Sequence, residues 1–178
     1  MNNTMRKTAT DEMNTALNAQ ANLLGQYVDS AETYLKEYAS AQEIRDLLKQ
    51  PENKAYIKTA QEYTTRYYEN LTAWEGIYTS TWETAVRVHS SPSGLGMVLR
   101  TGDAVAPYLA AMTGSEGGLY NGGVFMSPAS GQMILNMRMA VYDTDGTTPI
   151  GFVGGGPFIS ELGALLENFT VEGLDRAE

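Results

Sequence analysis

The sequence predicts an α+β protein in which a long N-terminal helix packs on an antiparallel sheet of about five strands. Residues 1–70 contain a single glycine, Gly25, and all of the lysines, a composition that permits long helices. Residues 71–178 contain the remaining glycines, and short β-branched and aromatic runs alternate there with turn residues. The last three of these runs are joined by short turns. This spacing indicates an antiparallel meander, because a parallel crossover would need a longer connection.

The first half predicts three helices. Apolar residues spaced alternately four and three apart form one stripe along a helix over residues 10–38. Ser40 and Glu43 form a capping box that starts a short helix, which ends by Gln50. Pro51 cannot continue that helix but suits the first turn of a third one. The stripe on the first helix consists of Leu17, Ala21, Leu24, Val28, Ala31, Leu35 and Tyr38.

The second half predicts five strands, which cover residues 73–81, 84–89, 119–126, 132–142 and 149–155. Run 132–142 alternates most clearly: its odd positions are apolar from Met133 to Val141, and Asn136 and Arg138 lie on the other face. We expect the methionine-rich face to lie beneath the leading helix. The connections are a loop over 90–96, a short helix over 103–112, turns at 127–131 and 143–146, and a closing helix over 160–169.

Composition excludes several classes of function. The formal net charge is -9, whereas binding to nucleic acid or to anionic lipid needs clustered Lys and Arg. Without cysteine, the chain has no thiol nucleophile, no disulfide and no Cys-ligated metal. A single histidine excludes a site built from two imidazoles. The opening residues predict no signal peptide, and we expect no membrane span, because no stretch reaches the about 18 to 20 apolar residues that cross a bilayer.

Three motifs resemble catalytic or metal sites but lack their essential parts. Phe152–Gly156 has the strand–glycine pattern of a phosphate cradle, yet no parallel strand or P-loop lysine follows, so we expect close backbone packing. Asp143–Gly146 resembles the start of a calcium loop without its closing glutamate, and is typical of a hairpin turn. His89 beside Ser90 lacks a nucleophile elbow. We therefore predict no enzymatic activity, no cofactor and no metal site.

Arg138 is the residue that most favours a binding site. Arg87, Arg100 and Arg138 are the arginines and lysines between Tyr67 and Asp175. A guanidinium on a sheet face is solvated, paired with an acid or available to an anionic ligand. Polar groups that converge within an aromatic wall make a typical small-molecule site. The candidate ligand-binding residues are Arg138, Asn136, Trp82, Tyr78, Tyr120, Arg100 and His89. Two alternatives stay open: Arg138 in an ordinary ion pair, and aromatic residues that complete the core.

The order of four motifs resembles that of bacterial Cache sensor domains. These motifs are Val88–Met97, Ser127–Gln132, Ala140–Gly146 and Ile150–Gly155. The resemblance covers roughly residues 10–170 and includes the long leading helix. It implies a PAS-like sheet with that helix on one face and a small ligand on the other, roofed by residues 90–118. It also implies the extracytoplasmic part of a chemoreceptor, a histidine kinase or a cyclic-dinucleotide signalling protein.

The same resemblance sets the expected organisation. Residues 1–70 form the helical segment of the sensor domain, 71–170 the PAS-like sheet with its roofing loop and closing helix, and 171–178 a tail or the start of a further module. Membrane attachment would come through segments outside these residues, and the N-terminal helix could join two copies into a homodimer. Amino-acid-binding members carry an aspartate near the end of the last strand. The matching Gly154–Pro157 has none, which leaves a small carboxylate or a neutral compound more open.

Two further hypotheses compete with the sensor. The heptad stripe could make the chain a helix-mediated dimerisation module that binds no small ligand. A small enzyme that depends on His89 is the third hypothesis.

Overall fold

The computed structural model describes residues 3–160, and the chain divides into two compact units: Met1–Ser30 with Ile159–Glu178, and Ala31–Phe158. The helices are α1 (Asn3–Ala39), α2 (Gln42–Lys49), α3 (Lys54–Glu69) and α4 (Val105–Thr113). The strands are β1 (Trp74–Thr81), β2 (Val86–His89), β3 (Leu119–Met126), β4 (Met133–Tyr142) and β5 (Pro149–Pro157).

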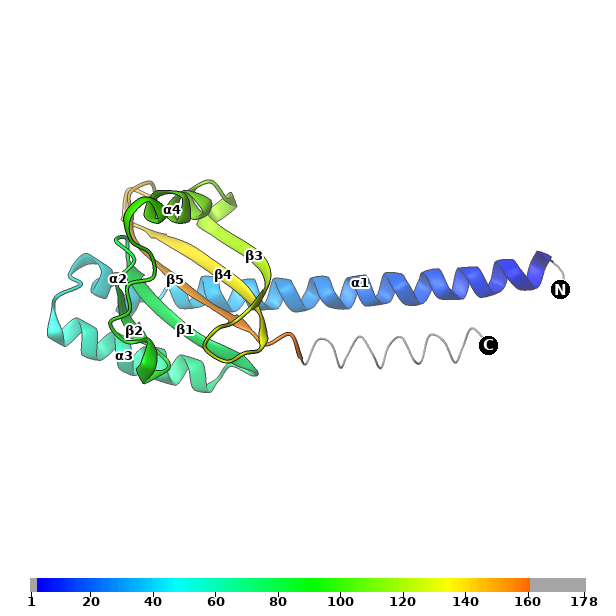
Figure 1. The fold of residues 1–178 in the computed structure, drawn as a ribbon, viewed down its shortest axis with the longest axis horizontal. Coiled ribbons are helices and arrows are strands. Elements are labelled where there is room, and N and C mark those ends of the chain that lie inside the picture. The colour runs from blue at the N-terminus through cyan, green and yellow to red at the C-terminus, as the bar shows by residue number, and fades with distance from the viewer. Residues whose placement is uncertain (1–2, 161–178) are drawn as a thin grey trace. The chain divides into compact units, whose positions relative to one another are not determined.

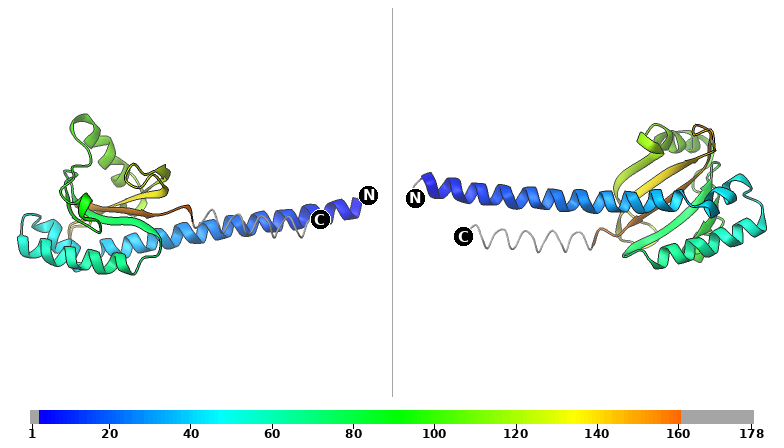
Figure 2. Two further views of the ribbon diagram at one scale, coloured as in Figure 1. Left: turned by 60° about the horizontal axis from the view of Figure 1, so that its bottom comes forward. Right: turned by 180° about the vertical axis from the view of Figure 1, so that it is seen from behind.

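The second unit is built on a five-stranded sheet in the order β2-β1-β5-β4-β3. All four neighbouring pairs are antiparallel, so the predicted meander of β3, β4 and β5 is confirmed. Figures 1 and 2 show α2 and α3 on one face of the sheet and α4 on the other. We call these faces the α2–α3 face and the α4 face. The sheet therefore separates a helical layer from a smaller roof.

The α2–α3 face holds most of the buried core. The end of α1, residues 31–39, belongs to this unit and contributes fully buried Leu35 and Tyr38. From α2, Ile44 and Leu47 are fully buried. A Cβ on Gly151 of β5 would meet the Leu48 side chain, so α2 lies directly against the sheet there. Burial of these side chains is the main force that fixes the helices to the sheet.

A chain of buried hydroxyl groups joins three elements of this core. The Thr64 hydroxyl in α3 donates to the Ala60 carbonyl at 2.7 Å, so its oxygen accepts from the Tyr38 hydroxyl, also at 2.7 Å. The Tyr38 oxygen then accepts from the Thr79 hydroxyl of β1 at 2.9 Å. Burial raises the pKa of Tyr38 well above its usual value, so the group stays a neutral hydrogen-bond donor.

Replacing Tyr38 with phenylalanine should destabilise the protein by about 1–3 kcal/mol, because the hydroxyls of Thr64 and Thr79 lose a buried partner. Urea unfolding should show a lower midpoint with an unchanged m-value. Tyr67→Phe is the matched control: its hydroxyl donates to the Tyr34 carbonyl at an exposed position, and its loss should cost less. Equal losses in the two variants would contradict the importance of the buried chain.

Strand β4 buries side chains on both faces. Leu135, Met137 and Val141 are buried on the α2–α3 face, whereas Arg138 and Ala140 are buried on the α4 face. The predicted division between a methionine-rich face and an arginine face is therefore confirmed. Met133 is the exception, because it is 40% exposed at the end of the strand.

Several predicted element ends are wrong. Helix α1 begins at Asn3, before the predicted residue 10. Ser40 caps nothing: its hydroxyl donates to the Lys36 carbonyl at 2.8 Å, and Ala41 is the N-cap of α2. A local bond to the preceding turn competes with the cap, because α1 continues to Ala39.

The third helix and two strands also differ at their ends. Asn53, whose side chain accepts from the N–H groups of Ala55 and Tyr56, caps α3, so that helix does not start at Pro51. Thr84 has a positive φ of 68° in a turn, which delays the start of β2 to Val86. Strand β5 continues to Pro157. The predicted closing helix over 160–169 begins at the last described residue and otherwise lies outside the described residues.

In the first unit, α1 exposes part of its predicted stripe. Leu17 is 58% exposed and Leu24 is 40% exposed. Within residues 3–160, no helix combines the length and the apolar character that crossing a membrane would require.

Candidate functional site

The candidate site is a row of residues that crosses all five strands on the α4 face. Antiparallel pairing aligns His89 of β2 with Tyr78 of β1, and Tyr78 with Gly154 of β5. Gly154 pairs in turn with Arg138 of β4, which pairs with Tyr120 of β3. Residues paired in this way point to the same side of a sheet. Four of the seven predicted site residues therefore share one row.

Gly154 makes room for the row to close. A Cβ at this position would overlap the ring and hydroxyl of Tyr78, so the Tyr78 side chain lies across the glycine toward Arg138. Burial raises the pKa of Tyr78 well above its usual value, and Tyr108 raises it further, whereas Arg138 and Arg100 act to lower it. The Tyr78 hydroxyl is thus neutral and lies in the field of two guanidinium groups.

Arg138 is held between aromatic rings. It is only 6% exposed, and its guanidinium carbon lies 3.8 Å from the ring centre of Tyr108 and 4.8 Å from that of Tyr120. Its Nη2 donates to the Tyr108 carbonyl at 3.4 Å, a long hydrogen bond. Its buried Nε has no hydrogen-bond partner. Cation–π contacts of a desolvated guanidinium are worth about 2 kcal/mol.

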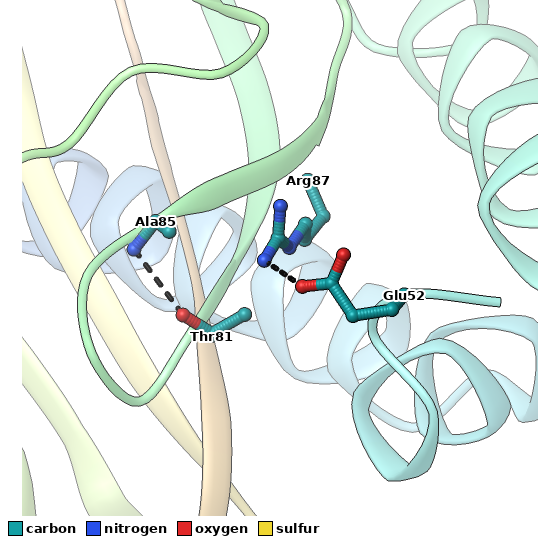
Figure 3. Close-up of polar contacts among 4 residues, drawn as sticks. All are labelled: Glu52, Thr81, Ala85 and Arg87. Carbon is teal, nitrogen blue, oxygen red and sulfur yellow. Dashed lines mark hydrogen bonds and ion pairs between the residues drawn. The ribbon is translucent and has the colours of Figure 1, made fainter. Parts of the chain in front are cut away.

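No acid compensates this charge: within the described residues, no carboxylate lies at ion-pair distance from Arg138. Arg87 shows the ordinary alternative. Its guanidinium pairs with Glu52 at the surface, as Figure 3 shows, although its Nε also lacks a hydrogen bond. The ion-pair alternative therefore applies to Arg87 and not to Arg138. Removing an ion from water costs several kcal/mol, a cost that the two cation–π contacts oppose.

Tyr108 of helix α4 is a further candidate site residue, which the sequence did not indicate. Besides covering Arg138, its ring lies 4.6 Å from the guanidinium carbon of Arg100. It also meets Phe152 of β5 at 5.7 Å, edge to face. The sequence signal that could have identified it is its position in the predicted short helix, which belongs to the 90–118 segment expected to cover the ligand. Arg100, which is exposed, therefore reaches the same ring as Arg138.

His89 contributes the face of its ring to the row, and its Nδ1 is occupied by a backbone hydrogen bond. Its ring stacks on Tyr78, with centres 5.6 Å apart and planes 9° apart. Nδ1 accepts from the backbone N–H of Ser91 at 2.8 Å, which leaves the proton of the neutral ring on Nε2. Burial lowers its pKa, although Glu75 acts to raise it. The Ser91 hydroxyl bonds Ser93, so no Ser–His pair forms at this position.

The remaining predicted residues lie farther along the same face. Trp82 packs edge to face on Phe152 at 6.3 Å and joins a core cluster with Met112 of α4 and Ala140. The aromatic residues thus complete a core and also surround Arg138. Asn136 is half-buried and precedes Arg138 by two residues on β4, and its side chain lies beside Gly122. Neither residue forms a hydrogen bond with Arg138.

The motifs set aside in the sequence adopt the expected ordinary structures. Gly156 lies so close to β4 that a Cβ would overlap the Leu135 carbonyl oxygen, as close backbone packing requires. Asp143–Gly146 forms the turn between β4 and β5. The side chain of Asp145 accepts from Thr147 and Thr148, and these bonds lower its pKa to about 2. The described residues contain no cluster of three or more potential metal-ligating side chains.

A separate cavity of about 240 Å³ opens beside the same turn. Its walls include Ala39 of α1, Arg45 of α2 and the β4 residues from Met139 to Tyr142, with Ser40 between the helices and Asp143 after the strand. Arg45 donates there to the Tyr142 carbonyl at 3.4 Å. This cavity contains none of the predicted site residues.

Comparison with known proteins supports the fold. No family model and no curated protein matches the sequence. Among solved structures, the sensor domain of the V. cholerae histidine kinase DctB matches with a TM-score of 0.70 at 16% identity, over 88% of this chain and 58% of that one. A putative sensory box/GGDEF family protein from Vibrio parahaemolyticus matches with a TM-score of 0.62 at 16% identity, over 92% and 65%.

Chemoreceptors are also similar. The sensory domain of Campylobacter jejuni Tlp3, solved with isoleucine bound, matches with a TM-score of 0.61 at 12% identity, over 90% of this chain and 64% of that one. The chain therefore spans about three-fifths of the length of these structures. The five-stranded antiparallel sheet with its long N-terminal helix is the fold of Cache-type sensor domains, as the motif order predicts.

Proposed function

We propose that this chain is the small-molecule-sensing domain of a bacterial transmembrane signal-transduction receptor. The ligand would bind on the α4 face of the sheet, under residues 90–118. The observation that carries the proposal is Arg138, a guanidinium 6% exposed, surrounded by aromatic rings and without an acidic partner in the described chain. A buried charge of this kind gains most when a ligand supplies the missing hydrogen-bond acceptor.

The structural neighbours support the sensing role and its location. They are sensor domains of histidine kinases, a GGDEF-family protein and a chemoreceptor, and one is described as an extracellular domain. An extracytoplasmic position, with membrane attachment through segments outside these residues, belongs to the same proposal. A non-catalytic role belongs to the same proposal: His89 is engaged by a backbone N–H and an aromatic stack, and no nucleophile among residues 3–160 is hydrogen-bonded to its ring.

Strand β1 provides a direct route from the site to α1. Tyr78 points to the α4 face beside Arg138, while the next residue, Thr79, points to the opposite face and bonds Tyr38 near the end of α1. A ligand that moves Tyr78 therefore acts on a strand already bonded to the helix. The signal would be a shift between two packings, limited by the difference in ligand affinity between them.

The dimerisation module remains the second candidate, because part of the α1 stripe is exposed at Leu17 and Leu24. The two candidates differ in their response to ligands. A module that only joins helices would form dimers in light scattering and would not respond to any small molecule.

A thermal-shift screen of the purified chain tests the proposal against carboxylates, amino acids, sugars and purines. A cognate ligand at about 100 times its Kd should stabilise the fold by about 2.7 kcal/mol. For a domain of this size that is a rise in Tm of about 5–10 °C. A chain that gives no rise with any of these compounds, but scatters as a dimer, would support the dimerisation module and contradict the sensor.

A further inference from the structure

Two positively charged side chains reach the Tyr108 ring at the centre of the site. The guanidinium groups of Arg138 and Arg100 lie 3.8 and 4.6 Å from the centre of the same ring, that of Tyr108. Neither forms an ion pair with any described acidic residue. The same two arginines are the groups that act to lower the pKa of Tyr78, against burial and Tyr108, which raise it. Around Tyr108 the described residues therefore supply two positive charges and no acidic ion-pair partner for either.

The other members of the row are uncharged. Tyr78 and Tyr120 offer hydroxyl groups and ring faces, Gly154 offers only backbone, and burial favours the neutral form of His89. The end of β5 next to the row is Gly154–Pro157, which carries no acid. No carboxylate of the row stands ready to receive a ligand ammonium group.

We infer that the ligand is an organic carboxylate with a short apolar body and no ammonium group; this inference rests on the proposed function. The Tyr108 carbonyl now accepts from Arg138 at 3.4 Å, whereas a carboxylate would accept at about 2.8 Å and carry a full negative charge. The Arg138 Nε–H, which has no hydrogen-bond partner, supplies a second donor on the same edge of the guanidinium group as Nη2.

The apolar body and the missing ammonium follow from the same walls. Tyr120 and Tyr78, both half-buried, present ring surface that desolvates an aliphatic or aromatic group. An ammonium group in this position would lie near two guanidinium groups, and no acid of the row would receive it, so it is repelled and left without a partner. Isoleucine, bound in the Tlp3 structure, carries both groups.

Matched triads of compounds test the inference by isothermal titration of the purified chain. Each triad holds an amino acid, its deaminated acid and its decarboxylated amine. They are valine, 3-methylbutanoate and isobutylamine; isoleucine, 3-methylpentanoate and 2-methylbutylamine; and phenylalanine, 3-phenylpropanoate and 2-phenylethylamine. In the triad whose body fits, the deaminated acid should bind at least about tenfold more tightly than the amino acid, and the amine should not bind.

A charge reversal at Arg100 sharpens the test, because this exposed side chain can change without disturbing the core. Arg100→Glu should move the preference of the same triad toward the amino acid by at least about tenfold, and Arg100→Gln should give an intermediate preference. Far-ultraviolet circular dichroism confirms that the variants are folded.

The outcomes separate the inference from the proposed function. An amino acid that binds the unaltered chain as tightly as its deaminated acid would overturn the inference and leave the sensor in place. So would a neutral compound that binds when no acid does. Absence of binding by every triad and by every compound of the thermal-shift screen would overturn the proposed function itself.

Discussion

Replacing Arg138 with methionine should abolish ligand binding, with a loss of affinity of at least about a hundredfold, and leave the free protein as stable as before or more stable. The guanidinium is buried and has no acidic partner in the described chain, so its removal relieves a desolvation penalty. Methionine fills a similar volume between Tyr108 and Tyr120. The loss of two cation–π contacts, about 2 kcal/mol each at this desolvated site, opposes this gain. The measurements are titration with the ligand found by screening and urea unfolding without it.

Arg87→Met is the matched control. Its exposed pair with Glu52 contributes about 0.2–1 kcal/mol, and the residue lies outside the row, so ligand affinity should not change. A structural role for Arg138 makes the opposite prediction: Arg138→Met would unfold at a clearly lower denaturant concentration than Arg87→Met. That result, or binding retained within threefold by Arg138→Met, would contradict the proposed role of Arg138.

Replacing Gly156 with alanine should give the largest loss of stability of the substitutions considered. The added Cβ overlaps the Leu135 carbonyl oxygen, a backbone atom that cannot rotate away. Strand β5 is the centre of the sheet, between β1 and β4, so separating it from β4 disturbs both halves. We expect a cost of about 3 kcal/mol, at the upper end of the usual range for overpacking. Calorimetry should show Tm lowered by about 6–12 °C.

Gly25→Ala makes the same chemical change and should have the opposite sign. Gly25 lies inside α1, and a Cβ there meets nothing within 4 Å. Alanine in a helix interior is favoured over glycine by about 1 kcal/mol. A Gly156→Ala variant with a Tm equal to that of the unaltered chain would show that β5 and β4 do not pack as closely as described.

The sequence predicted which segments are helices and which are strands, because those patterns are local. The heptad stripe gave α1, and the alternation over 132–142 gave β4 with Arg138 opposite Met137. Element ends were predicted less well. Ser40 and Glu43 have the spacing of a capping box, but the Ser40 hydroxyl donates to a carbonyl in the last turn of α1 instead. The choice between two local hydrogen bonds depends on where the preceding helix ends.

The site divides in the same way. The alternation within one strand determined that Arg138 lies on a face away from the methionines, and the order of motifs pointed to a roofed sheet. Only the tertiary structure aligned His89, Tyr78 and Arg138 in one row, because register between strands distant in sequence is set by pairing over long range. Only the tertiary structure placed the Tyr108 ring over Arg138, because the rotation of a short helix about its axis depends on the residues against which it packs.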